Sequence, residues 1–183
     1  MVTRKQPPSK GKKNPSSKST PSKGGQGKTA DKGNAVVSAY GNTWENVTEG
    51  TLADVQSVEG QIGVSLPPDL AEFLMKCGGG RPAKNFFESR AADLELGIGY
   101  VLPLREHPKK GGIASDCLRY RKHQGLDPSL VPFALDRGNA NLICMRLPGR
   151  DIVYWLHDDP DDRTRKVAPS LNDFLTGLEE TPY

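Results

Sequence analysis

A regular apolar pattern predicts a short helix with well-marked ends. Four apolar residues recur at the spacing i, i+3, i+4 and i+7, which places them on one helical face about two turns long. These residues are Leu70, Phe73, Leu74 and Cys77. Prolines 67 and 68 favour a helix start, and the three glycines 78–80 permit a sharp reversal of the chain. We therefore predict a helix from about residue 68 to 76.

Three further segments have helical patterns. The first runs from about residue 51 to 61, where Thr51 and Asp54 have the spacing of a capping pair. The second, 115–124, is polar, with Leu118 and Tyr120 as its main apolar residues. The last begins near residue 170 and places apolar side chains on one face, with Asp173 in the capping position. These apolar side chains are Leu171, Phe174, Leu175 and Leu178.

Between the third and last predicted helices the period changes to that of strands. Short apolar runs at 130–135, 142–147 and 152–156 are separated by turns rich in Asp, Gly and Asn. Such spacing is typical of an antiparallel meander. A short strand at 99–104 contains Pro103, which suggests a sheet edge. With helices first, a sheet later and one closing helix, the predicted fold is a single α+β domain, an antiparallel sheet flanked by helices. Whether Phe86 and Phe87 lie on a strand is left open.

Charge divides the chain into two parts. Residues 1–34 hold nine Lys and Arg against one acidic residue, a net charge of +8. The other 149 residues hold 16 basic and 21 acidic side chains, a net charge of −5. Because the basic segment is rich in Lys, Ser, Pro and Gly, it cannot bury enough apolar surface to fold. We expect a disordered tail over residues 1–35 and one domain over residues 36–183.

Two functions are open for the tail. Its cations would attract nucleic acid or another polyanion through counterion release, without sequence preference because aromatic residues are lacking. Alternatively, the tail is a solvated linker. The sequence GGQGKT at 24–29 lacks the first glycine and the preceding strand of a phosphate-binding loop, so we do not expect a nucleotide site there.

The sequence gives no indication of an enzyme or a cofactor. Cys77, Cys117 and Cys144 are too widely spaced for a zinc knuckle and are expected to be reduced and buried. We find no nucleophile elbow and no triad order. No apolar run is long enough to span a bilayer, and the N-terminus does not resemble a secretory signal, so we expect a cytoplasmic protein without membrane contact.

The densest acidic cluster follows the last predicted strand and is the candidate partner-binding site. Its members are Asp158, Asp159, Asp161 and Asp162. Carboxylates suit a hard cation, but Pro160 interrupts the cluster and the spacing is not that of a calcium loop. A solvated turn is a second interpretation. The third is an acidic contact patch for a basic protein, since complementary charge raises association rates and specificity.

An ordered set of motifs resembles the SUKH superfamily of cell-wall-assembly regulators and bacterial relatives. The set spans about residues 52–178. It comprises Val58-Glu59, Ile62-Gly63, Leu66-Pro67, Phe73-Leu74 with Gly79-Gly80, Val131-Pro132-Phe133-Ala134, the turn from Asp136 to Asn141, the strand through Ile143, the tryptophan strand and Ser170 to Leu175. One departure is Cys77-Gly78, where the family often has Asn before its paired glycines.

The resemblance implies a non-enzymatic binding protein. Many bacterial members of this superfamily are immunity proteins that neutralise a cognate toxin, often a nuclease, by direct contact. A domain with a net charge of −5 is electrostatically suited to a basic nuclease. The expected partner is thus a cognate toxin domain. The alternative is a regulatory or scaffold protein of the same fold, whose basic tail recruits nucleic acid or another acidic partner.

Overall fold

The computed structural model describes residues 35–90, 92–108, 111–159 and 162–182. The helices are α1 (Leu52–Ile62), α2 (Pro68–Cys77), α3 (Ile113–Gln124) and α4 (Leu171–Thr176). The first five strands are β1 (Ala35–Ala39), β2 (Asn42–Val47), β3 (Arg81–Pro82), β4 (Phe86–Ser89) and β5 (Leu94–Val101). The remaining strands are β6 (Leu130–Asp136), β7 (Leu142–Arg146), β8 (Ile152–Trp155) and β9 (Thr164–Ala168). The predicted tail lies outside the described residues as far as residue 34, and Ala35 begins β1.

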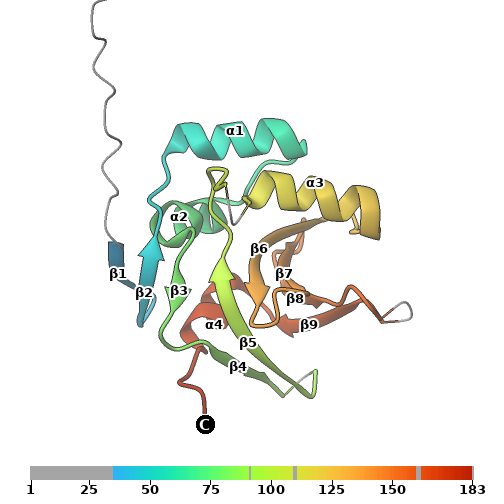
Figure 1. The fold of residues 1–183 in the computed structure, drawn as a ribbon. Helices are drawn as coiled ribbons and strands as arrows, with labels where there is room; N and C mark the ends of the chain where they lie inside the picture. Colours follow the sequence, from blue (N-terminus) through green and yellow to red (C-terminus); the bar gives the residue numbers. More distant parts are fainter. Residues whose placement is uncertain (1–34, 91, 109–110, 160–161, 183) are drawn as a thin grey trace, which may run out of the picture. The chain divides into compact units, whose positions relative to one another are not determined.

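The strands form two antiparallel sheets, and the predicted α+β class is confirmed. A three-stranded sheet has the order β1-β2-β3, and a six-stranded sheet has the order β4-β5-β6-β7-β8-β9. Every neighbouring pair is antiparallel, so the predicted meander is confirmed and extends beyond the three strands expected from the sequence. Helices α1 and α3 lie beside each other, as Figure 1 shows.

The two N-terminal helices agree with the sequence patterns. Thr51 caps α1 in a reciprocal capping box, in which its backbone N–H donates to the Asp54 carboxylate at 2.7 Å. In α2 the predicted apolar stripe is buried, and Phe73 meets the rings of Trp44 and Phe133 edge to face. Helix α2 thus joins the small sheet to the large one through a common aromatic core.

The glycines after α2 allow the chain to pass close to both sheets. Gly79 has a φ of +75°, and its N–H donates to the Val101 carbonyl at 2.9 Å. A Cβ atom on Gly80 would lie 2.9 Å from a methyl group of Val47, closer than side chains tolerate. This segment therefore requires small residues because of backbone approach, in agreement with the predicted reversal.

The β1–β2 hairpin was not predicted, and the expected order of helices before sheet is wrong in this respect. Tyr40 and Gly41 both have positive φ values, 55° and 68°, as a two-residue primed turn requires. Strand β2, NTWENV, is mostly polar, so hydrophobicity alone does not mark it. Trp44 on β2 is nevertheless fully buried and holds the hairpin on α2.

One other expectation is wrong, and another holds in part. Pro103 does not mark a sheet edge, because β5 ends at Val101 and lies between β4 and β6. Of the two apolar residues named for α3 from the sequence, Tyr120 is buried and Leu118 is 44% exposed, so Tyr120 belongs to the buried face of the helix and Leu118 does not. This face comprises Ile113, Ala114, Asp116, Cys117 and Tyr120. Apolar content in a polar helix was a poor guide because small residues and cysteine pack closely on a sheet.

The open question at Phe86 and Phe87 is resolved as strand β4. Phe87 packs on Phe174 of α4, with ring centroids 4.9 Å apart. On the outer side of β4, Phe86 exchanges two backbone hydrogen bonds with Glu179, of 3.1 and 2.8 Å. The segment after α4 thereby covers part of this sheet edge.

Candidate functional site

The predicted acidic cluster lies in the loop between β8 and β9, at the end of the six-stranded sheet. Asp158, Asp159 and Asp162 are described by the structure, whereas Asp161 lies outside the described residues. We call residues 156–163 the acidic loop. Its flanking strands pair with each other, with Trp155 opposite Thr164, so the two ends of the loop are held together.

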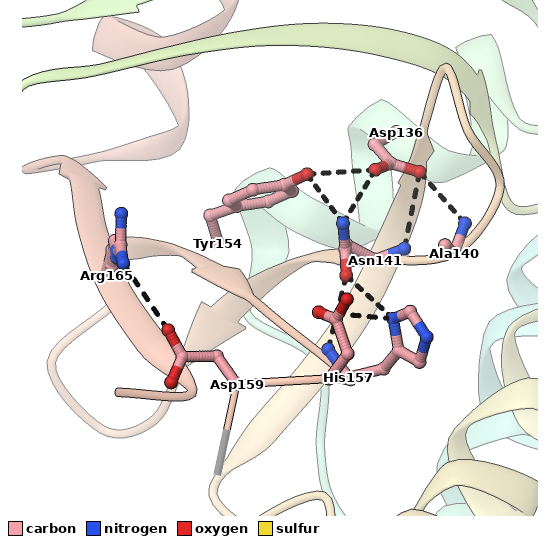
Figure 2. A network of polar contacts seen from close by, with 8 residues as sticks. Asp136, Ala140, Asn141, Tyr154, His157, Asp159 and Arg165 are labelled. Atoms are coloured by element: carbon pink, nitrogen blue, oxygen red, sulfur yellow. Dashed lines mark hydrogen bonds and ion pairs between the residues drawn. The ribbon is translucent and has the colours of Figure 1, made fainter. Parts of the chain in front are cut away.

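Arg165 of β9 brings two of the predicted residues together. Its guanidinium group lies 3.5 Å from Asp159 and 3.2 Å from Asp162 (Figure 2 shows the pair with Asp159). The Asp162 N–H also donates to the Asp159 carboxylate at 3.0 Å. Arg165 therefore offsets part of the negative charge that the sequence predicts for the acidic loop.

Asp158 projects differently from its neighbours. Its side chain is 74% exposed, and the His157 ring Nδ1 lies 3.9 Å from its carboxylate. Of the predicted residues that the structure describes, Asp158 is the one that presents its carboxylate most openly.

A side-chain network fixes the beginning of the acidic loop (Figure 2). The Asn141 Oδ1 atom accepts a hydrogen bond from the His157 backbone N–H at 3.2 Å and lies 3.0 Å from the His157 ring Nδ1. The other polar atom of this side chain, Asn141 Nδ2, donates to the Asp136 carboxylate and to the Tyr154 hydroxyl, each at 2.9 Å. Asn141 thus joins the loop to the interior of the sheet.

The centre of this network is the buried carboxylate of Asp136. It accepts hydrogen bonds from the Ala140 N–H at 3.0 Å and from the Tyr154 hydroxyl at 2.9 Å, in addition to those from Asn141. Burial, reinforced by the bond to Asp136, raises the pKa of Tyr154 to about 12. Because buried polar groups are costly unless paired, this satisfied network favours one conformation of the β6–β7 turn.

Asp136 and Asn141 were noted in the sequence as the ends of a turn in the family pattern and not as site residues, and Tyr154 was not singled out. A usable signal was the Asp and Asn content of the turn at 136–141, since both side chains bond to backbone groups in turns. Tyr154 gave no such signal, because its strand reads as an uninterrupted apolar run.

The described part of the chain contains no group of three or more His, Cys, Asp and Glu side chains that could hold a metal ion. The three cysteines are free and buried, as predicted, and burial raises the pKa of the Cys77 thiol to about 12. Such thiols are poor nucleophiles because little thiolate forms near neutral pH. Among the described helices, none combines the length and apolar character needed to cross a membrane.

Comparison with known proteins supports the resemblance seen in the sequence. The chain is 27% identical over 153 residues to a Bacillus subtilis (strain 168) protein described as "SPbeta prophage-derived uncharacterized protein YokK". That alignment covers 72% of this chain and 76% of the relative. The family model for "SMI1 / KNR4 family (SUKH-1)" matches residues 49–177, from the residues before α1 to the glycine after α4. With the fold and this match in agreement, the chain belongs to the SMI1/KNR4 family (SUKH-1).

Proposed function

We propose that this protein is an immunity protein that neutralises a cognate bacterial toxin by binding it directly, without catalysis. The observation that carries the proposal is membership of SUKH-1, in a superfamily of immunity proteins. The similarity to a prophage-derived protein is consistent with a gene carried on mobile DNA. We expect the immunity protein to bind the toxin in the cytoplasm. A nuclease is one class of toxin that fits this proposal.

The acidic loop is the proposed contact surface. Asp158 is open to solvent, and Asp159 and Asp162 are held by Arg165 beside it. A body with a net charge of −5 attracts a basic toxin domain over distances of about a Debye length. Because the Asn141 network already holds His157 at the start of the loop, less conformational entropy is lost there when a partner binds.

The test is co-expression of the full chain with the toxin domain encoded directly upstream of its gene. We expect restored growth and a complex that survives purification of the tagged immunity protein. Absence of both growth and complex would contradict the proposal. An unrelated toxin domain serves as the specificity control and should remain toxic.

A second function is favoured by the charge division of the sequence. Nine Lys and Arg in residues 1–34 suit a regulatory or scaffold protein whose tail recruits nucleic acid or another acidic partner. Deletion of residues 1–34 separates the two. In the immunity proposal, with the tail as a linker, neutralisation persists and any salt-sensitive retention on DNA disappears. Loss of neutralisation after the deletion would contradict the linker role.

A further inference from the structure

A polar hollow of about 330 Å³ lies at the junction of β3, β5 and the β6–β7 turn. Two arginines and two asparagines contribute to its lining: Arg81, Asn85, Arg137 and Asn139. Its floor includes Gly99 of β5, where the register with β6 shifts between Ile98 and Tyr100. The hollow thus combines two cations with two neutral amides, all of which can donate hydrogen bonds.

Arg137 is held in a defined position. Its backbone N–H donates to the Gly97 carbonyl at 2.9 Å, and a Cβ atom on Gly97 would lie 2.6 Å from Arg137 Cδ. The aliphatic part of the Arg137 side chain therefore packs directly on the β5 backbone at Gly97. One terminal nitrogen, Nη2, donates to the side-chain oxygens of Asn85 and Thr181. These neutral acceptors orient the guanidinium group and leave its charge unneutralised.

Neither arginine of the hollow has a carboxylate partner within the described residues. Other arginines of the domain do have one: Arg105 pairs with Asp54 at 2.9 Å, and Arg119 with Asp116 at 2.6 Å. Arg81 and Arg137 are both exposed and form no ion pair within 4.0 Å in the described ranges, despite the acidic character of the body. The oriented guanidinium group of Arg137 and the exposed Arg81 beside it, neither with a counter-charge in the described ranges, leave room for an external anion.

We propose that this hollow binds an acidic side chain of a protein partner. A carboxylate matches the planar fork of a guanidinium group, and amide donors beside it complete the coordination. Nucleic acid is the less suitable occupant, because its dense charge is repelled by a body of net charge −5. A single carboxylate on a protein surface meets much less of this repulsion.

The β6–β7 turn contributes to the hollow and also contacts the acidic loop. Arg137 and Asn139 belong to the same β6–β7 turn as Asn141, which bonds to His157 at the start of that loop. In so far as the partner is the toxin domain, the inference rests on the proposed function. The Arg137 hollow would then select a partner that offers a carboxylate next to its basic surface, which adds specificity to attraction.

The hollow is tested in the isolated full-length protein by NMR titration with a blocked Gly-Glu-Gly tripeptide. We expect saturable shifts of the Arg137 Nε–H and Gly99 N–H signals, and none with the matched Gly-Gln-Gly peptide. Arg137→Gln should weaken binding about tenfold, which corresponds to one charge-assisted hydrogen bond. Arg137→Lys keeps the charge without the fork and should give a smaller loss.

Two further variants separate binding from folding. Arg81→Gln leaves the Arg137 contacts with Asn85 and Thr181 intact and should still weaken peptide binding. Arg150→Gln removes an exposed arginine outside the hollow and should leave binding unchanged. Equal binding of both peptides, an equal effect of Arg150→Gln, or tighter binding of inorganic phosphate or a DNA oligonucleotide at the hollow, read from the Gly99 N–H signal and not from the tail, would each overturn the proposal.

The outcome is distinguishable from that of the toxin experiment. If the acidic peptide does not bind while the protein still neutralises its toxin, the hollow proposal fails and the immunity proposal stands. If the peptide binds at Arg137 while neutralisation fails, the hollow stands as a carboxylate site and the toxin is not its partner.

Discussion

Ser89 and Val167 join the two edge strands of the large sheet. The Ser89 hydroxyl, on β4, donates to the Val167 backbone carbonyl, on β9, at 2.9 Å. The two residues are 78 positions apart in the chain, and β4 and β9 are the first and last strands of the sheet. The sheet therefore curls nearly into a barrel, and this hydrogen bond helps to close it.

Ser89→Ala tests this closure. Ser89 is 3% exposed, so removal of its hydroxyl leaves a buried carbonyl without that donor. We expect a loss of about 1–3 kcal/mol in the free energy of unfolding, measured by urea denaturation. Ser57→Ala, on the exposed face of α1, is the matched control and should change stability by less than about 0.5 kcal/mol. Equal stabilities of the two variants would contradict a closing role for Ser89.

Asp54 should make the stability of α1 depend on pH in the acid range. Hydrogen bonds from Arg105, then from Thr51, hold the pKa of Asp54 well below its usual range. A carboxyl whose pKa is lower in the folded state contributes stability above its unfolded pKa, about 3.9, and this is lost as pH falls through the folded value. At pH 7, Asp54→Asn should cost about 1 kcal/mol through the weakened cap.

The difference in unfolding free energy between wild type and Asp54→Asn should therefore shrink below about pH 4. Glu49→Gln, at an exposed position before α1, provides the control. A constant difference between pH 7 and pH 2 would show that the carboxylate charge of Asp54 is unimportant.

Tyr154 should make the stability of the protein depend on pH in the alkaline range. Its pKa is raised to about 12, first by burial and then by its hydrogen bond to Asp136. Since the unfolded value is about 10, the corresponding stability is complete below pH 10 and is lost as pH rises toward 12. Tyr154→Phe should cost about 1 kcal/mol at pH 7. The wild type should lose this advantage in urea denaturation above pH 10, and an unchanged difference there would refute the assignment.

Asp158 and Asp159 of the acidic loop should behave differently in partner binding. Asp158→Asn removes an exposed carboxylate and should slow toxin association with little effect on stability, because rim charges act mainly on the on-rate. Asp159→Asn also removes a contact with Arg165 and should disturb the loop, seen as shifted Arg165 and Asp162 NMR signals. Surface-plasmon measurements at two salt concentrations give the rates. Unchanged association of Asp158→Asn would exclude this residue from the contact.

Local sequence patterns were sufficient to predict the elements that are specified by a few neighbouring residues. Helix α2 was predicted from its apolar stripe and flanking Pro and Gly, and α4 from Ser170, whose side chain accepts from the Asp173 N–H at 3.1 Å. The meander was predicted because its strands are apolar runs separated by turn residues. Family resemblance and fold class followed from the order of these elements.

The small sheet and the sites depended on contacts distant in sequence. The polar strand β2 is held on the domain by the packing of Trp44 on Phe73, and the start of the acidic loop is held by Asn141, which also bonds to the buried Asp136. Similarly, Arg165 and Arg137 have the same local character in the sequence, yet one is paired with carboxylates and the other is not. The sequence by itself determined the four helices, the strands of the meander and the charge of the domain, since helix and strand periods are local. Only the tertiary structure decided which charges are neutralised and which are presented, because ion pairing depends on distances between strands that folding brings together.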